Sequence, residues 1–395
     1  MRLLDVTIRQ DGGTVALVGT VRREDREFEL YFQYPEWCGG FLRPNADPFL
    51  TAMSVPAAVA GEVLSSDLPA SPRLLRGLTR AVDVLSTRHP DELGRLTLDV
   101  PIRTEPLLGG ADLAASFFSC GVDSFDTALQ NLRYPAPGNP PLTYALFFHG
   151  LETQLEKEVG AEAAAAHAAR TAQALGLRCI VGRTNIRSHF PLDYGRHYAG
   201  IALSAAALSL AGGYSVLFLP SSVYNASLHG YGHDMLIDES CSTEYLRLEN
   251  DGGDVSRTHK VIRSVARSDI ALANLRSCYV NSGALENCGV CSKCLRTMMA
   301  LEIAGVLKNS GSFPKTLQPD FLERMGMNRP DHIHPNIVAI REVGASLWMI
   351  PALERKARQV ILKNALREYL EESPVRGLLT SWRERKRARA LEEAR

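Results

Sequence analysis

The sequence predicts an α/β protein built on a parallel β-sheet with helices on both faces. Four apolar segments, each long enough for one strand, alternate with helix-like stretches in the middle of the chain. Near-continuous apolar strands are typical of a parallel sheet that is buried on both faces. A turn of small residues follows the first segment, as in sheets that bind ligands at the carboxyl ends of their strands. The predicted strands are 113–118, 143–148, 178–182 and 214–219, and the predicted helices are 157–176 and 197–211.

The composition is that of an ordinary globular protein. Of 395 residues, 45% are hydrophobic and 22% are charged, and 44 Lys and Arg balance 44 Asp and Glu. Without net charge, no overall field draws the chain to a nucleic acid or a membrane surface. No apolar run approaches the roughly 18 residues of a membrane span, and the N-terminus lacks the apolar core of a signal peptide. We therefore expect a cytoplasmic protein with no membrane partner.

The length is sufficient for two or three domains, and the patterning changes twice along the chain. The pattern over residues 1–108 predicts a small α+β module of unknown role. In this module Ser71 is the expected N-cap of a helix and Pro72 its first residue. Residues 109–310 carry the parallel sheet, and 311–395 predict a C-terminal helical extension. The strands of the first module are expected within 4–8, 14–18, 27–32 and 96–100, its helices near 47–64 and 72–88, and the C-terminal helices at 353–373 and 378–395.

The turn after the first apolar strand has the composition of an anion site. The first N–H groups of a helix and its positive dipole end meet where a strand passes through small residues into a helix. Asp123 is a candidate ligand of Mg²⁺ or an orienting group, and Ser119 and Ser124 add hydroxyl donors. No Gly-Lys-Ser/Thr follows, so the turn is not of the Walker type. The candidate phosphate-binding residues are Ser119, Cys120, Gly121, Val122, Asp123 and Ser124.

Polar residues also stand where the later strands end. Because the carboxyl ends of parallel strands meet at one edge of a sheet, these residues are candidates for the same site. They are His149, Gly150, Asn185, Arg187 and Ser221.

A long polar stretch, residues 224–260, is expected to be a functional loop over this edge. His233 and Asp238 are candidates for acid–base or orienting roles. Arg257 and Lys260 are candidates for binding a phosphate or a substrate carboxylate. Ser256 is equally well explained as the cap of the helix that follows it.

Four cysteines near residue 290 predict a metal site. Cys278, Cys288, Cys291 and Cys294 follow the pattern C-x₉-C-x₂-C-x₂-C, which suits tetrahedral Zn²⁺. Four thiolates leave no open position, so the metal is expected to be structural. An iron–sulfur cluster is the alternative for the same spacing.

Together, the two motifs resemble a known enzyme family. The loop Ser119–Ser124 resembles the S-G-G-x-D-S loop of the PP-loop (N-type) ATP pyrophosphatases, with Cys120 in place of the first glycine. The loop and the cysteine pattern together resemble 7-cyano-7-deazaguanine synthase over about 109–305, and more closely its longer bacterial homologues with an added N-terminal domain. The S-G-Y-P-D-C-R string of the synthase itself is absent, and Gly232-His233-Asp234 stands in its place.

The resemblance implies a HUP-type fold, that of the adenine nucleotide alpha-hydrolase-like proteins, and a carbon–nitrogen ligase activity. ATP with Mg²⁺ would activate a small-molecule carboxylate as an acyl-adenylate, with release of pyrophosphate. An amine or ammonia would then displace AMP to give an amide, or in a further step a nitrile. The catalytic residues expected on this basis are Asp123, Ser124, His233, Asp238 and Lys260, and Arg257 would bind the nucleotide.

Three other functions stay open from the sequence, one of which is a nucleotide-binding sensor with an inactive site, suggested by Cys120 in the loop. A PP-loop sulfur transferase would need a reactive cysteine near the strand ends, and Cys120, Cys179 and Cys241 are the candidates. A modifier of a protein or nucleic acid in a defence-type system would use the added terminal regions on a macromolecular substrate. A homodimer also stays open.

Overall fold

The computed structural model describes residues 1–156, 158–222, 224, 231–278, 287–318, 320–327 and 329–372. The chain forms two compact units, Met1–Gln318 and Pro319–Arg395. The division falls close to the predicted start of the C-terminal extension at 311. The predicted boundary at 108, in contrast, lies inside the first unit.

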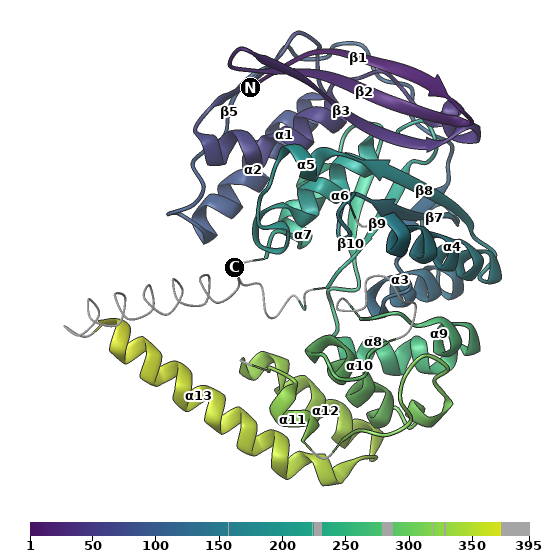
Figure 1. Ribbon diagram of the computed structural model, residues 1–395, viewed down its shortest axis with the longest axis vertical. Helices are drawn as coiled ribbons and strands as arrows, with labels where there is room; N and C mark the ends of the chain where they lie inside the picture. The colour runs from purple at the N-terminus through teal and green to yellow at the C-terminus, as the bar shows by residue number, and fades with distance from the viewer. Residues whose placement is uncertain are drawn as a thin grey trace. The chain divides into compact units, whose positions relative to one another are not determined.

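The first unit contains one 10-stranded sheet with the order β10-β9-β6-β7-β8-β3-β2-β1-β4-β5 (Figure 1). From β6 the chain adds β7 and β8 on one side, then returns to add β9 and β10 on the other. Neighbours in this half are parallel, which is the doubly wound arrangement that places ligands where the strand order reverses. Its strands are β6 (Ala114–Phe117), β7 (Leu142–His149), β8 (Arg178–Thr184), β9 (Val216–Pro220) and β10 (Arg247–Asp251).

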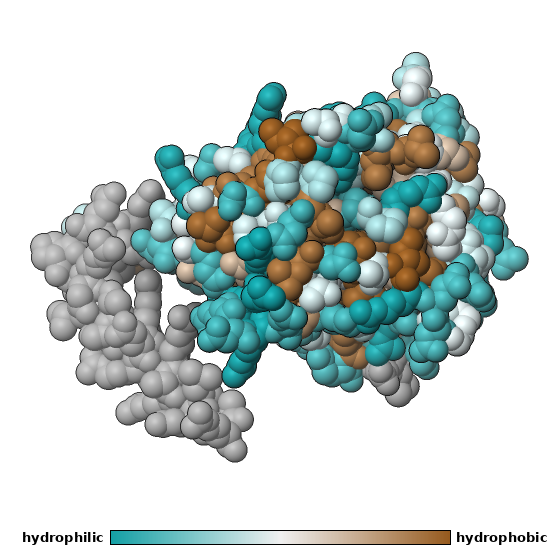
Figure 2. Space-filling view, turned by 90° about the horizontal axis from the view of Figure 1, so that it is seen from above, coloured by the Kyte–Doolittle hydropathy of each residue, from teal (hydrophilic) through white to brown (hydrophobic). Residues whose placement is uncertain are grey.

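The predicted N-terminal module is a continuation of this sheet. Three antiparallel strands join β8 through β3, where Phe32 pairs with Thr184 and Gln33 with Arg183. On the outer face of these strands, Arg9 pairs with Glu29 and Arg22 with Glu27, and polar residues are mixed with apolar ones on the side seen in Figure 2. The strands are β1 (Arg2–Asp11), β2 (Thr14–Arg23), β3 (Arg26–Pro35), β4 (Val63–Ser66) and β5 (Thr97–Asp99).

Helices cover both faces of the sheet, as the sequence predicts. Successive side chains of a strand point to opposite faces, and Ala115 and Phe117 of β6 join one core while Ala114 and Phe118 join the other. The first core includes α1 (Asp47–Ala60), α2 (Pro72–Arg88) and α6 (Ala199–Leu208). The second core includes α3 (Val122–Arg133), α4 (Glu158–Ala174), α8 (Arg257–Arg263), α9 (Asp269–Asn274) and α10 (Ser292–Ile303).

Several boundaries differ from the predicted ones for physical reasons. The helix near 47–64 ends at Ala60 because Val63–Ser66 forms β4 beside β1 and β5. The predicted loop 224–260 contains a short helix, α7 (Met235–Asp238), and the edge strand β10. Residues 223 and 225–230 of this stretch lie outside the described residues. Ser71 and Ser256 cap α2 and α8, accepting hydrogen bonds from the N–H groups of Leu74 and His259.

The second unit is helical in its described part. It contains α11 (Phe321–Arg324), α12 (His334–Val343) and α13 (Ile350–Glu372), and the last corresponds to the predicted helix 353–373. The predicted helix 378–395 lies outside the described residues. None of the helices in the described ranges is long and apolar enough to cross a membrane.

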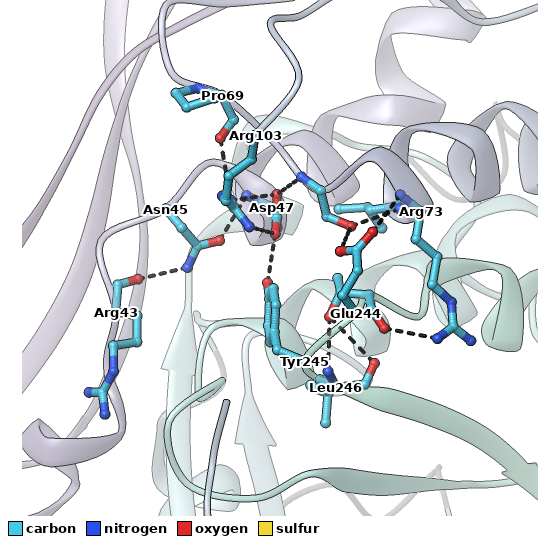
Figure 3. A network of polar contacts seen from close by, with 12 residues as sticks. Arg43, Asn45, Asp47, Pro69, Arg73, Arg103, Glu244, Tyr245 and Leu246 are labelled. Carbon is cyan, nitrogen blue, oxygen red and sulfur yellow. Dashed lines mark hydrogen bonds and ion pairs between the residues drawn. The ribbon is translucent and has the colours of Figure 1, made fainter. Parts of the chain in front are cut away.

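A buried carboxylate at the start of α1 connects four segments of the first unit (Figure 3). Asp47 is fully buried and accepts two hydrogen bonds from Arg103, at 2.9 and 3.0 Å. It also accepts the hydroxyl of Tyr245 at 2.7 Å and the N–H of Ser71 at 3.0 Å. The network joins α1, the cap of α2, the chain after β5 and the chain before β10, so it ties the N-terminal residues to the parallel half of the sheet.

We predict that Asp47→Asn lowers the free energy of unfolding by about 3–5 kcal/mol, because removing one partner leaves the Arg103 charge buried without compensation. Urea denaturation followed by circular dichroism measures the change. Asp67→Asn is the matched control, because the Asp67–Arg2 pair is exposed and such pairs contribute little. Equal effects of the two substitutions would contradict the assigned role of the network.

Candidate active site and cysteine cluster

The loop Ser119–Ser124 connects β6 to the first turn of α3. Cys120 has a φ of +59°, the left-handed region that favours the glycine of the PP-loop pattern. Gly121 is the N-cap of α3, so the first N–H groups of the helix have no partner within it. The Ser124 hydroxyl donates to the Gly121 carbonyl at 3.1 Å and accepts the N–H of Ser119 at 3.3 Å. The loop therefore combines a left-handed turn with the free N-terminal end of a helix.

A cavity of about 460 Å³ lies at this loop. It is located at the carboxyl ends of β6, β7 and β9, where the order of the strands reverses. Its wall combines apolar rings with charged groups, a composition typical of ligand sites. Predicted site residues that line it are Ser119, Gly121, Asp123, Ser124, His233, Arg257 and Cys278.

Asp123 is ion-paired with two of the basic residues of α8. Its Oδ2 lies 2.9 Å from Arg257 Nη1, and its Oδ1 lies 3.0 Å from Lys260 Nζ. Burial alone would raise the pKa of the Asp123 carboxyl, but the charges of Lys260 and Arg257 outweigh this and hold the pKa well below its usual range. Lys260 is 2% exposed and also donates to the Ser221 carbonyl. Lys260 therefore positions Asp123 without itself lining the cavity.

His233 carries a fixed positive charge at the cavity wall. Its Nδ1 lies 2.7 Å from Asp238 Oδ2, and its Nε2 lies 3.1 Å from the Pro220 carbonyl. Because both neighbours are acceptors, both ring nitrogens carry protons. Burial lowers the pKa of His233, but the charge and hydrogen bond of Asp238 outweigh this and raise it to about 9. Asp238, held by Asn250 at 2.7 Å, is a positioning residue.

Besides Nδ1 of His233, which faces Asp238, three buried polar atoms of cavity-lining residues have no hydrogen-bond partner among the described residues. They are Nε of Arg257, Nε of Arg276 and Oγ of Ser277. Buried polar atoms are rarely left unpaired in a native structure, so these atoms are available to hydrogen-bond a ligand or ordered water in the cavity. Lys293 also lines the cavity and lies 3.4 Å from Glu152.

Other predicted residues support the wall rather than line it. His149 Nε2 bonds the Gln154 carbonyl at 3.0 Å. Gly150 has a φ of +99°, and a Cβ there would lie 1.9 Å from the Thr184 carbonyl oxygen. The Arg187 guanidinium stacks 4.5 Å from the ring of Tyr194, which does line the cavity. Cys120 and Val122 are buried in the second core.

Asn185 has a structural position that differs from the predicted nucleotide contact. Its amide accepts from the N–H of Tyr31 at 2.9 Å and donates to the carbonyl of Glu29 at 2.8 Å. Asn185 therefore holds β3 against the end of β8 and is not part of the cavity lining.

Sequence reasoning missed two cations of the cavity, Arg276 and Lys293. Both belong to the cysteine-rich segment, in which the spacing of the sulfur ligands is the conspicuous pattern. Arg276 and Lys293 are close in sequence to Cys278 and Cys294. Because the cysteine segment was expected to end the domain that carries the loop, this closeness could have marked both as candidates. Tyr194 was missed as well, since nothing in its sequence context distinguishes it from a core residue.

The four cysteines form a cluster that could hold a metal such as zinc. Their Sγ atoms all lie within 4.8 Å of one another, with 4.0 Å between Cys278 and Cys291 and 3.8 Å between Cys288 and Cys294. Four ligands about 2.3 Å from a tetrahedral Zn²⁺ would be about 3.8 Å apart, so the donor set fits. Gly289 has a φ of +68°, and a Cβ there would lie 2.5 Å from Pro314.

The cysteine cluster and the loop are directly connected. The N–H of Arg276, two residues before Cys278, donates to the Cys120 carbonyl at 2.8 Å. Asn287 accepts the N–H groups of Ser277 and Cys278 at 2.8 and 3.0 Å, which holds the segment beside Cys288. A metal in the cluster would therefore stabilise the strained backbone of the loop as well as the end of the domain.

A scan against protein-family models, a search of curated proteins and a search of solved structures each found no match for this chain. The class that the structure defines is an α/β protein with a doubly wound sheet half, a cationic cavity at its carboxyl edge and a four-cysteine cluster.

The raised pKa of His233 predicts a pH dependence of stability. The stabilisation from the imidazolium is complete below the ordinary pKa of 6.5 and is lost as the pH rises through about 9. Between these values the free energy of unfolding should fall by about 1.4 kcal/mol per pH unit. Unfolding midpoints of the wild type and His233→Gln measure this. The variant should lack this part of the slope, and identical slopes would contradict the assignment.

The cluster predicts that Cys288→Ser loses the metal and lowers the melting temperature. Three thiolates and a hydroxyl bind Zn²⁺ more weakly than four thiolates. Elemental analysis and calorimetry measure both effects, and Cys179→Ser, in β8 and outside the cluster, is the control. Visible absorption separates the two candidate metals, because an iron–sulfur cluster is coloured and zinc is not. Unchanged metal content in Cys288→Ser would contradict the site.

Proposed function

We propose that the chain is an ATP-dependent carbon–nitrogen ligase of the PP-loop type, with the HUP-type fold. The observation that carries the proposal is the set of unpaired donors on Arg257, Arg276 and Ser277 beside the loop 119–124. A polyphosphate would supply the acceptor oxygens and the negative charge that these unpaired donors need. The strand order and the left-handed conformation at Cys120 support the proposal.

The residues of the cavity fit a nucleotide. Four cationic side chains line it, against two carboxylates. The rings of Phe117 and Phe148, whose centroids are 6.0 Å apart, also line it and supply an apolar surface for a base. Both oxygens of Asp123 accept from a cation, yet a carboxylate has about four lone-pair sites. Asp123 would therefore still have a lone pair for Mg²⁺, which when bound would neutralise charge on the phosphates. The cationic residues are His233, Arg257, Arg276 and Lys293.

In the proposed reaction a substrate carboxylate oxygen attacks the α-phosphorus of ATP. The bond to the β-phosphate oxygen breaks, and diphosphate leaves toward the N–H groups of Gly121 and the first turn of α3. Arg257, Arg276 and Lys293 hold the developing negative charge. An amine then attacks the acyl carbon, AMP leaves, and one proton is released. His233 remains an imidazolium near neutral pH and serves as a fixed positive charge rather than a base.

The three candidate thiols do not favour sulfur transfer, because all are buried or partly buried and have raised pKa values. Cys241 is fully buried in the first core, and burial raises its pKa to about 12. Burial likewise raises the pKa of Cys120 and of Cys179 to about 12. A reactive thiol is normally accessible and has a lowered pKa. No described observation favours the sulfur reaction over the ligase.

Incubation of the full chain with ATP, Mg²⁺, ammonium and a panel of carboxylic acids tests the ligase. We expect acid-dependent release of pyrophosphate and AMP, measured by ³¹P NMR and chromatography. Asp123→Ala should reduce the rate by at least about a hundredfold, the order expected for loss of one charge-stabilising group. Asp25→Ala, in the exposed turn between β2 and β3, is the matched control. Release of ADP, or full activity of Asp123→Ala, would refute the proposal.

A further inference from the structure

A second cluster of metal-ligating side chains lies outside the cavity, between the end of α2 and a π-helical turn, Tyr194–Tyr198. His89 is the C-cap of α2, Glu92 follows it in the next turn of chain, and His197 belongs to the π-helical turn. One ligand atom from each residue lies within 4.8 Å of the other two. The imidazole centroids are 4.8 Å apart, with the rings inclined at 78°.

Both imidazoles are buried, and within the described chain neither has a protein partner for all of its ring nitrogens. Each histidine is 6% exposed, and the Nε2 atoms of both have no hydrogen-bond partner among the described residues. Nε2 of His197 faces Glu92 Oε2 at 3.1 Å without forming a hydrogen bond. Buried ring nitrogens in a native structure are normally paired with protein, water or a metal.

We propose that Nε2 of His89, Nε2 of His197 and the carboxylate of Glu92 bind a divalent transition metal such as Zn²⁺. Imidazole and carboxylate are established ligands of this ion, and two imidazoles with one carboxylate leave a position open for water or another ligand. The site differs in kind from the cysteine cluster, because nitrogen and oxygen donors replace four thiolates. The proposal does not depend on the ligase function.

Arg196 occupies the position of a competing cation. Its Nη2 lies 3.0 Å from His89 Nδ1 and 2.8 Å from Glu92 Oε1. A guanidinium only donates hydrogen bonds, so Nδ1 of His89 accepts and the ring proton is on Nε2. When a metal binds Nε2, this proton moves to Nδ1, and the Arg196 side chain, 49% exposed, turns toward solvent. The metal and Arg196 are therefore alternative partners of the same ligands.

The site is coupled to the cavity through the π-helical turn. The same turn that carries His197 contributes Tyr194 and Gly195 to the cavity wall, and the Gly195 carbonyl accepts the N–H of Gly232 at 3.0 Å. Turns of this kind are often found at functional sites. A bound metal would fix this part of the wall to the end of α2.

Titration of the full chain with Zn²⁺, after the cysteine cluster has been loaded, tests the proposal. Calorimetry and elemental analysis should find a second Zn²⁺ per chain. With Co²⁺ as the probe, the second site should add d–d absorption without thiolate charge transfer. His89→Gln and His197→Gln should each weaken this second binding at least about tenfold. His189→Gln is the matched control, because its ring stacks on Phe28 outside the cluster.

Arg196→Gln should bind the second Zn²⁺ more tightly than the wild type, which a merely structural role of the histidines does not predict. The Glu92 side chain is 42% exposed, so Glu92→Gln should weaken binding of the second Zn²⁺ with little effect on folding. This variant replaces the histidine variants if these do not fold. A single Zn²⁺ per chain in the wild type, or equal second-site affinity in Glu92→Gln, overturns the site. Weaker binding by Arg196→Gln overturns the competition.

Discussion

The ion pairs of Asp123 with Arg257 and Lys260 hold the beginning of α3 against α8, and the geometry of the cavity depends on them. Two buried or half-buried cations in one place would repel each other without a shared anion. Asp123 supplies that anion at the end of the loop, so the loop and α8 are fixed by the same contact. Nε of Arg257, a cavity-lining residue, then has no hydrogen-bond partner within the described part of the chain.

The cysteine cluster extends this constraint to the backbone of the loop. A Cys in the left-handed region costs roughly 1–2 kcal/mol relative to its ordinary conformation, so the surroundings must impose it. The N–H of Arg276 bonds the Cys120 carbonyl, and Asn287 fixes the adjoining chain to the cluster. The cysteine cluster is distant in sequence from the loop, yet the chain beside it is hydrogen-bonded to the backbone of Cys120.

The sequence predicted those parts of the structure that follow from periodicity and local chemistry. The strands and helices of the parallel half carry strong apolar patterns, and the cysteine spacing determined a compact cluster. β10 was missed because Leu248 is the one buried residue among its five. Its pairing with β9 is made by main-chain groups and therefore leaves no apolar pattern in the sequence. The junction of β3 with β8 was missed for a similar reason, since two residue pairs at the ends of the strands cannot be read from either strand alone. Arg276 and Lys293 enter the cavity through tertiary packing of the cysteine segment, which no local signal encodes.

The burial of the Cys120 thiol explains the role of this residue, which departs from the PP-loop pattern. A cysteine at that position could be a reactive group or a tolerated replacement for glycine. Its side chain is fully buried in the second core, and burial raises its pKa to about 12, so it is neither ionised nor accessible near neutral pH. Its backbone nevertheless has the conformation that glycine would adopt. Apolar packing of the sulfur in the core can offset the strain, which favours a loop that retains the geometry of an anion site without gaining thiol chemistry.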